Sequence, residues 1–246
     1  MAEGPFTFCI DIGGTGIKGL VVDRRGKPVD PRDRVETPQP ATPRAVLRAI
    51  AKIAADQPPF DRVSAGFPGV VKDGVVLSAP NLHPSWAGVD LERELRRLTK
   101  RPARVQNDAG VQGLAAIRGK GTEIVVTLGT GMGFALFRNG RYVPNIELAH
   151  HPLRGKKTYE DLVGNAARQQ AGRKKWNRRV REVIATLARV FNYDHLYLGG
   201  GNTKHLAGEL PSDVSIVSNQ DGLLGGVRLW ETEVAARPRR SAAVKA

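Results

Sequence analysis

The chain has 246 residues, which is enough to bury one large hydrophobic core or two smaller ones. Hydrophobic residues make up 41% of the sequence and charged residues 25%, as in an ordinary globular protein. No run of 18 or more apolar residues predicts a membrane span, and the first residues lack the pattern of a signal peptide. The single cysteine, Cys9, excludes an internal disulfide and a cysteine-rich zinc site. We therefore expect a cytoplasmic protein without zinc and without a membrane partner.

The charge of the chain is strongly positive and unevenly distributed. Lysine and arginine number 38 against 24 acidic residues, which gives a net charge of +14. The window from Arg154 to Arg181 holds ten basic residues and two acidic ones, so it carries +8 of that total. Such a cluster indicates a polyanionic partner, such as nucleic acid, anionic lipid or polyphosphate. A solvated helix face would have the same composition, so the cluster alone does not name the partner.

The first half of the chain alternates strand patterns and helix patterns. Strands are indicated by short runs of β-branched residues between turns, and helices by apolar residues at helical spacing. The predicted elements are strands at 7–14, 17–23 and 33–38, a helix at 42–56, a strand ending at 64–69, a hairpin at 70–77, a helix at 89–100, a strand at 103–108 and a helix from 109 to about 118.

The second half repeats the opening pattern of the first. The predicted elements are two strands around a glycine turn at 123–137, helices at about 159–170 and 176–191, a strand into a glycine turn at 194–201, a short strand at 213–217 and a last helix from 223 to about 235. This repetition predicts two similar lobes, and a cleft between lobes is a preferred ligand site. We place the lobes at 1–105 and 106–235, with the last helix packing back on the first lobe. A basic tail over 236–246 is predicted to be disordered.

The turn DIGGTGIK, at residues 11–18, has the composition of an anion site. A Walker loop or a dinucleotide fingerprint would continue from the glycines into a helix. Here the glycines are followed by residues 17–23, which favour a strand. The sequence therefore predicts a tight glycine hairpin and excludes both of those nucleotide motifs.

Such a hairpin suits phosphate because its backbone N–H groups can converge on an anion. Thr15 adds a hydroxyl donor and Lys18 a positive charge. The predicted phosphate ligands of this turn are Gly13, Gly14, Thr15 and Lys18. Asp11 would repel a phosphate unless a cation lay between them, so we assign it to hydrated Mg²⁺.

A second turn, TLGTGMG at residues 127–133, matches the first. Its predicted phosphate ligands are Thr130 and Gly131. Either turn by itself could be a hairpin without a ligand. Two such turns facing each other across a cleft favour the binding of a phosphate chain.

Two further segments carry polar groups suited to a sugar. Asp108 ends a strand and begins a helix, where a carboxylate can accept a proton from a substrate hydroxyl or can simply cap the helix. Glu147 and His150 lie close together in the sequence NIELAHH and are suited to binding several hydroxyl groups. Asn81 lies on a nearby polar loop. We expect these residues to form a polyol pocket.

The ordered motifs DIGGTGIK, GFPG, QNDAG, TLGTGMG, IELAHH and YLGGG resemble those of the ROK sugar kinases, over about residues 6–235. Within that family the chain looks most like the polyphosphate glucokinases. The resemblance implies an α/β, two-lobed actin-like ATPase (ribonuclease H-like) fold. Each lobe would be a mixed sheet with helices, and the active site would lie in the interlobe cleft.

The resemblance also implies a role for each matching residue. Asp108 would be the general base for the sugar 6-hydroxyl, with Mg²⁺ as the cofactor. The sugar ligands would be Asn81, Asn107, Glu147, His150 and Glu160. A turn bordering adenosine, if ATP is used, would be Gly199, Gly200 and Gly201. A polyphosphate chain would follow a basic track made of Lys156, Lys157, Lys174, Lys175, Arg178 and Arg179.

Two residues depart from the family pattern in the sugar pocket. Ala149 stands where the family usually has glycine, and Gly110 where asparagine is common. The zinc motif that many members carry cannot exist with one cysteine, and polyphosphate glucokinases also lack it.

The expected function is transfer of a terminal phosphoryl group from polyphosphate, with ATP as a further donor, to the 6-hydroxyl of glucose. One alternative is an ATP-dependent ROK hexokinase for glucose or another hexose. A more distant alternative is a non-catalytic sugar-responsive or nucleic-acid-binding protein, for which no nucleic-acid motif is present. A homodimer is expected from the family.

Overall fold

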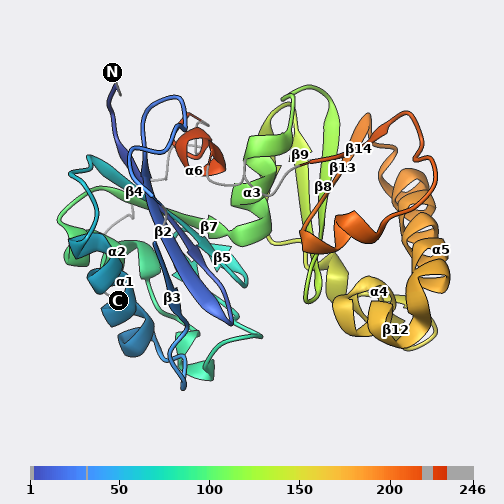
Figure 1. Cartoon of the computed structure of the whole chain (residues 1–246), viewed down its shortest axis with the longest axis horizontal. Coiled ribbons are helices and arrows are strands. Elements are labelled where there is room, and N and C mark those ends of the chain that lie inside the picture. Colours follow the sequence, from blue (N-terminus) through green and yellow to red (C-terminus); the bar gives the residue numbers. More distant parts are fainter. Residues whose placement is uncertain (1–2, 32, 218–223, 232–246) are drawn as a thin grey trace, which may run out of the picture.

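The computed structural model describes residues 3–31, 33–217 and 224–231, which form two α/β lobes side by side (Figure 1). The strands are β1 (Thr7–Ile12), β2 (Gly16–Val22), β3 (Asp33–Glu36), β4 (Arg62–Phe67), β5 (Val71–Lys72), β6 (Val75–Val76), β7 (Ala103–Asn107), β8 (Thr122–Leu128), β9 (Met132–Arg138), β10 (Arg141–Val143), β11 (Pro152–Arg154), β12 (Lys157–Thr158), β13 (His195–Gly199) and β14 (Val214–Ile216). The α-helices are α1 (Pro43–Ala55), α2 (Leu91–Thr99), α3 (Asp108–Ala116), α4 (Tyr159–Val163), α5 (Asn165–Phe191) and α6 (Leu224–Arg228). Three 3-10 helices are η1 (Pro84–Trp86), η2 (Leu148–His150) and η3 (Gly201–His205).

The two lobes have sheets of the same design. The first sheet has the order β3-β2-β1-β4-β7 and the second the order β10-β9-β8-β13-β14. In each, three antiparallel strands are followed by two strands that run parallel to the first. The predicted α/β fold of two similar mixed sheets is therefore confirmed. The hairpin of β1 and β2 also confirms that a strand, and not a helix, follows the first glycine turn.

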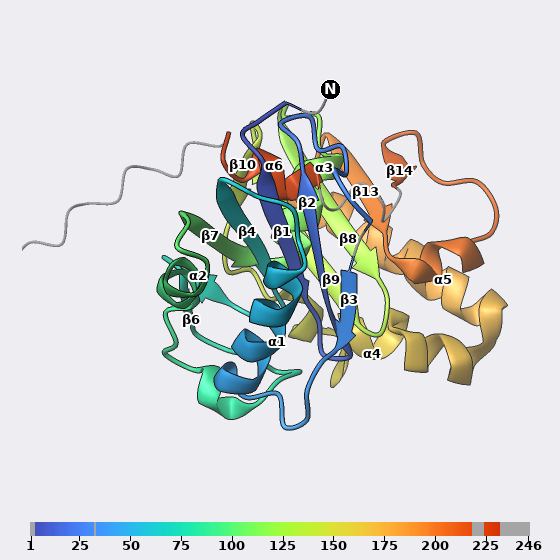
Figure 2. The same cartoon turned by 60° about the vertical axis from the view of Figure 1, so that its left-hand side comes forward.

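Helices cover the two faces of the first sheet unequally. Helices α1 and α2 lie on its outer face, as Figures 1 and 2 show, and their apolar residues join one core with β1, β4 and β7. Helix α1 is capped by Thr42, whose hydroxyl accepts from the N–H of Ala45. Helices α3 and α6 lie on the inner face, toward the second lobe.

Helix α3 is the element that both lobes share. It contacts β4 and β7 of the first sheet and β8 and β9 of the second. Its buried apolar residues, among them Ala109, Val111 and Leu114, join a core with Phe137 and Tyr197 of the second lobe. The orientation of α3 is therefore set by both sheets at once.

Helix α6 returns from the second lobe and packs against β1, β4 and α3. The Ser64 hydroxyl donates to the carbonyl of Gly226 at 2.6 Å, and the indole N–H of Trp230 donates to Ser64 at 2.8 Å. The guanidinium of Arg228 donates to the carbonyl of Leu114 at 2.8 Å. These contacts tie the end of the described chain to the first lobe and to α3 together.

One helix differs from the sequence predictions. The helix predicted at 159–170 ends at Val163, because Gly164 has an extended conformation (φ −64°, ψ 170°), and a new helix begins at Asn165. Gly172 (φ 74°, ψ 160°) divides α5 into two helical segments, and this break lies inside the gap predicted at 171–175. Strand β7, at Ala103–Asn107, agrees with the strand predicted at 103–108. The end of the last predicted helix, at 232–235, and the tail at 236–246 lie outside the described residues.

The first turn of α3 packs on an aromatic ring from the second lobe. Tyr142 of β10 lies against Gly110, where a Cβ atom would be 2.9 Å from Cζ of the ring. This contact explains why Gly110 replaces a larger residue: the ring occupies the space that a side chain would need.

We predict that the effect of Gly110→Ala on stability changes sign with the residue at position 142. In the natural background the added methyl group meets the Tyr142 ring, and overpacking of this kind costs about 1–3 kcal/mol. In a Tyr142→Ala background only helix propensity remains, which favours alanine over glycine by about 1 kcal/mol. Urea unfolding of the two single variants and the double variant measures both effects. Additive free energies of unfolding would contradict the contact.

Candidate active site

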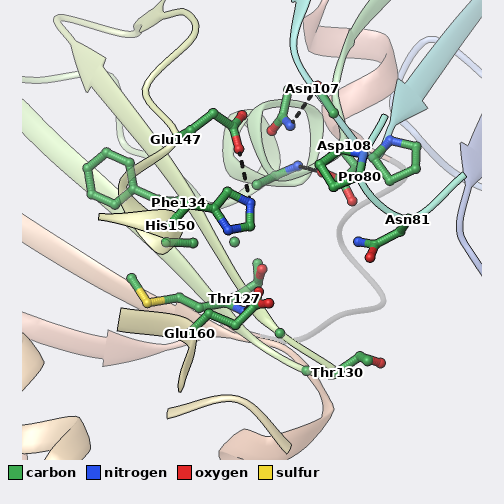
Figure 3. A pocket seen from close by; sticks show the side chains of 18 of the residues that line it. Pro80, Asn81, Asn107, Asp108, Thr127, Thr130, Phe134, Glu147, His150 and Glu160 are labelled. Carbon is green, nitrogen blue, oxygen red and sulfur yellow. Dashed lines mark hydrogen bonds and ion pairs between the residues drawn. The ribbon is translucent and has the colours of Figure 1, made fainter. Parts of the chain in front are cut away.

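A cavity of about 260 Å³ lies between the lobes at the beginning of α3 (Figure 3). The glycine turn after β1, the loops after β4 and β6, the β8–β9 turn and the segment around η2 form its walls. All six residues that the sequence predicted for catalysis and sugar binding line this first cavity: Asn81, Asn107, Asp108, Glu147, His150 and Glu160. Residues from both halves of the chain are thus brought to one place.

A second cavity, of about 380 Å³, adjoins the first. Its walls include Asp11, Lys18 and Gly200. The residues that line both cavities are Gly13, Asp108, Thr127, Gly129 and Thr130. The two spaces therefore meet at Asp108 and at the two glycine turns, one turn from each lobe.

Asp108 is free to face this junction because its neighbour caps the helix. The side-chain oxygen of Asn107 accepts from the N–H of Gly110 at 3.2 Å, which is the N-cap bond of α3. Asp108 is the first helical residue, and its Oδ1 accepts only from the N–H of the next residue, Ala109, among the hydrogen bonds between described residues. The helix-capping role that we considered for Asp108 therefore belongs to Asn107.

The surroundings of Asp108 raise the pKa of its carboxyl to about 7. The largest cause is burial, which disfavours the charged form. The negative charges of Asp11 and Glu147 act in the same direction, and the backbone hydrogen bond from Ala109 acts against them. A carboxyl with a pKa near 7 can take up and release protons at neutral pH.

Glu147 and His150 lie beside each other on one wall of the first cavity, with their side chains pointing toward one another (Figure 3). The Nε2 atom of His150 lies 3.8 Å from Oε2 of Glu147. Both side chains are exposed to solvent and line the first cavity. Both belong to the segment that enters η2, which Ala149 anchors in the core. The pair offers a carboxylate acceptor and an imidazole to a ligand with hydroxyl groups.

Glu160 connects this wall to the second glycine turn. It lies in the first turn of α4, and its Oε2 accepts from the N–H of Met132 at 3.1 Å. Gly131 lies directly against the same carboxylate, with no room for a side chain. Glu160 therefore holds the β8–β9 turn in place as well as lining the first cavity.

Asn81 and Asn107 have different freedom to bind a ligand. Asn81 lies on the loop before η1, which Trp86 anchors by burying its ring and donating to the carbonyl of Ala41 at 2.8 Å. The amide of Asn107 is already used at both ends, since its Nδ2 donates to the carbonyl of Gly69 at 3.1 Å. These two hydrogen bonds hold the beginning of α3 in place and leave the Asn107 amide little capacity to bind a ligand.

The two glycine turns use part of their own hydrogen-bonding capacity. The N–H of Gly13 donates to the carbonyl of Gly16 at 3.0 Å, and the N–H of Gly129 donates to that of Gly131 at 3.0 Å. The hydroxyl of Thr37, the residue after β3, donates to the carbonyl of Gly13 at 2.5 Å and holds the first turn in place. These two N–H groups donate within the turns and are not available to a phosphate. Binding of phosphate by backbone N–H groups would therefore depend on the other residues of each turn.

Asp11 and Lys18 are cross-strand neighbours in the hairpin and form an ion pair at 2.8 Å. Both line the second cavity, one with a carboxylate and one with a positive charge. A single carboxylate beside a space for phosphate fits Mg²⁺, which is commonly held by one or two carboxylates together with substrate phosphates. Within 3–31, 33–217 and 224–231, no group of three or more His, Cys, Asp or Glu side chains is placed to hold a metal ion by itself.

The residues predicted for the polyphosphate track fall on different surfaces. Lys174, Lys175 and Arg178 line one shallow hollow on α5. Arg179 points the other way, and its Nη1 donates to the carbonyl of Leu162 at 3.4 Å. Lys156 and Lys157 belong to the β11–β12 hairpin, which Arg154 joins to Glu182 of α5 through an ion pair.

The residues that line the two cavities include one residue of the proposed adenosine turn and two residues that sequence reasoning missed. Of the proposed adenosine turn, Gly200 lines the second cavity. Sequence reasoning missed Thr127, which lines both cavities, and Gln112, which lines the second. Thr127 stands at the end of β8 in the glycine motif, so its position was a usable signal, whereas nothing local marks Gln112.

Along the described part of the chain, none of the helices combines the length and apolar character needed to cross a membrane.

Comparison with known proteins agrees with this geometry. The ROK family model matches residues 7–144. Over 234 residues the chain is 32% identical to the polyphosphate glucokinase of Mycobacterium tuberculosis, and the match covers 89% of this chain and 88% of that protein. The crystal structure of inorganic polyphosphate/ATP-glucomannokinase from Arthrobacter sp. strain KM is similar with a TM-score of 0.82 and 34% identity, covering 92% of this chain and 98% of that one.

A ROK family glucokinase from Streptomyces griseus, solved with glucose and AMPPNP, shares the fold with a TM-score of 0.74 and 21% identity. The match covers 91% of this chain and 98% of the Streptomyces griseus chain. Family model, sequence relatives and fold thus agree over most of the molecule. The chain belongs to the ROK family, and within it to the group of the polyphosphate glucokinases.

Proposed function

We propose that this protein transfers the terminal phosphoryl group of inorganic polyphosphate to the 6-hydroxyl of glucose. The observation that carries the proposal is the position of Asp108, a carboxylate with a pKa near 7 at the junction of two cavities. The first cavity is lined by groups that suit a polyol and the second by Lys18, and residues of both glycine turns line the two cavities where they meet. The names of the relatives, polyphosphate glucokinase and polyphosphate/ATP-glucomannokinase, support both substrates.

The reaction needs little covalent chemistry from the protein. Glucose in the first cavity would be oriented by Glu147, His150 and Asn81, so that its 6-hydroxyl points to Asp108. The carboxylate of Asp108 accepts the hydroxyl proton while O6 forms a bond to the terminal phosphorus. The bridging P–O bond breaks, and its electron pair stays with the shortened phosphate chain.

The glycine turns and Lys18 would hold the phosphoryl group in the second cavity and stabilise its charge. Mg²⁺, which Asp11 would hold through water, would supply further neutralisation of the phosphate oxygens when bound. We also propose the homodimer that the family resemblance implies and the cytoplasmic location expected from the single cysteine. The distant alternative of a purely binding protein is less favoured, because a binding site has no need for a carboxyl with a pKa near 7 between two cavities.

We predict that the purified protein forms glucose 6-phosphate from glucose and long-chain polyphosphate. ATP is the second candidate donor, because Gly200 of the proposed adenosine turn lines the second cavity and the Arthrobacter relative is named for both donors. Parallel assays with each donor at equal phosphoryl concentration measure the preference. Turnover with ATP alone would replace this proposal with the ATP-dependent hexokinase.

Replacing the proposed base should abolish turnover while leaving donor binding intact. Asp108→Asn keeps the shape of the side chain but removes the proton acceptor, and loss of a general base typically costs about 10²–10⁴-fold in rate. The measurements are kcat for glucose 6-phosphate formation and the affinity for polyphosphate without glucose. Asp73→Asn is a matched control, since Asp73 is an exposed carboxylate in the β5–β6 turn with a left-handed backbone that asparagine also tolerates. More than a tenth of the natural rate in Asp108→Asn would disprove the assignment.

Activity should rise with pH through about 7. Only the deprotonated Asp108 can accept the hydroxyl proton, and its pKa is raised to about 7. A profile of kcat/KM against pH in the free enzyme should therefore show a rising limb near that value.

Stability provides an independent readout of the same titration. Because the folded-state pKa of Asp108 lies above its unfolded value, ionisation of this group weakens the fold as pH rises from about 4 to 7. Asp108→Asn removes this penalty, so its melting temperature should exceed that of the natural protein at pH 8. The difference should shrink as pH falls toward 4, and a difference independent of pH would contradict the raised pKa.

A further inference from the structure

Helix α5 begins at the second glycine turn and leads away from it. The N–H of Asn165 donates to the carbonyls of Gly129 and Thr130, at 3.1 and 3.0 Å. From Asn165 to Ala171 the chain is helical, and at about 1.5 Å per residue this first segment is about 10 Å long. Gly172 then breaks the helix with a left-handed φ of 74°, and a second helical segment follows.

The 3-10 helix η3 connects the same two places. The side-chain amide of Asn202 donates to the carbonyl of Gly129 at 2.8 Å, at one end of η3. Just past the break in α5, Arg173 donates to the carbonyls of His205 and Leu206, at 3.0 and 3.3 Å. Both segments therefore start at the glycine turn and meet again at Arg173.

A shallow hollow of about 560 Å³ lies where they meet. Five of its seven lining residues are cationic and none is acidic: Arg173, Lys174, Lys175, Arg178 and Arg181, with Ala171 and Gly172. Arg181 is held in place because it donates to the carbonyl of Ala207 at 2.6 Å. Like charges held so close repel one another, and a bound polyanion would relieve that repulsion.

The positive charge continues from the hollow toward the cleft. The pKa of His205 is lowered, first by desolvation and then by the charges of Arg168, Lys204 and Arg173. Arg168 lies one turn beyond Asn165 on α5, and its guanidinium donates to that residue's side-chain oxygen at 2.9 Å. A negatively charged chain leaving the second glycine turn would thus meet cations along this route.

We propose that a distal cationic surface, made of Arg168, Arg173, Lys174, Lys175, Arg178, Arg181 and Lys204, binds the part of a long polyphosphate chain that extends beyond the second cavity. The inference rests on the proposed function, and it adds a preference for donor length. A triphosphate seated at the glycine turns ends near the cleft, whereas a long chain reaches the hollow and binds at two places. Attachment at the second place raises the effective concentration of the chain at the first.

The test reverses charge at two exposed residues one turn apart on α5. In Lys174→Glu with Arg178→Glu, the affinity for long-chain polyphosphate should fall by about tenfold or more, because fewer phosphates are neutralised. Affinity for tripolyphosphate should change far less. Isothermal titration calorimetry without glucose measures both, and the salt dependence of long-chain binding should also weaken in the variant.

A matched control carries the same charge change at the same spacing on the other lobe. Arg44→Glu with Arg48→Glu alters two exposed residues of α1 and should leave both affinities within about twofold of the natural protein. A milder variant, Lys174→Ser with Arg178→Ser, repeats the test if charge reversal lowers the melting temperature. The proposal is overturned if long-chain binding is unchanged, or if long and short phosphates lose affinity equally.

Activity separates this proposal from the one it rests on. The ratio of glucose 6-phosphate formation with long-chain polyphosphate to that with tripolyphosphate or ATP should fall in the α5 variant. If the natural protein uses none of these donors, the proposed function fails, while the binding experiment still decides whether the distal cationic surface holds a polyanion.

Discussion

The side-chain amide of Asn107 holds the beginning of helix α3 in place, and the position of Asp108 in the site depends on it. One end bonds the carbonyl of Gly69 in the first lobe, and the other caps the first turn of α3 at Gly110. Both bonds are made at the boundary between the lobes, where β7 ends and α3 begins. As Asn107 caps the helix, the carboxylate of the next residue, Asp108, is left to face the two cavities.

The surroundings of α3 then determine the chemistry of that carboxylate. Helix α3 is packed between both sheets, and the ring of Tyr142 lies against Gly110. The resulting burial, together with the charges of Asp11 and Glu147, keeps the pKa of Asp108 near 7. The site thus accepts a cost in stability at neutral pH for a base that can exchange protons there.

The sequence was informative where structure follows from local patterns. Three features depend on neighbouring residues, and all were predicted: the strand after the first glycine turn, the matching second turn and helix α1, which Thr42 caps. We expected a polyol pocket from the residue types of Asn81, Glu147 and Asp108, and the family resemblance strengthened this expectation, because spacing alone does not bring three distant segments together. The structure shows the shared cavity, while the role of each residue in it stays a prediction.

The remaining features depend on tertiary contacts that no local pattern reveals. At Gly164, between α4 and α5, a Cβ atom would lie only 3.1 Å from the carbonyl oxygen of Thr130 in the β8–β9 turn. The inward turn of Arg179 could not be distinguished from the outward exposure of Arg178, since both are arginines on one helix. Likewise, no local pattern shows that Asn107 rather than Asp108 caps α3 while its amide also bonds to Gly69 in another loop.

A crystal structure of the protein with bound glucose tests the arrangement of the site most directly. The account predicts glucose in the first cavity, with its 6-hydroxyl within about 2.6–3.2 Å of the Asp108 carboxylate and directed toward the second cavity. Glu147 and His150 would contact the hydroxyls at the other end of the ring. Glucose bound in the second cavity, or with its 6-hydroxyl turned away from Asp108, would contradict it.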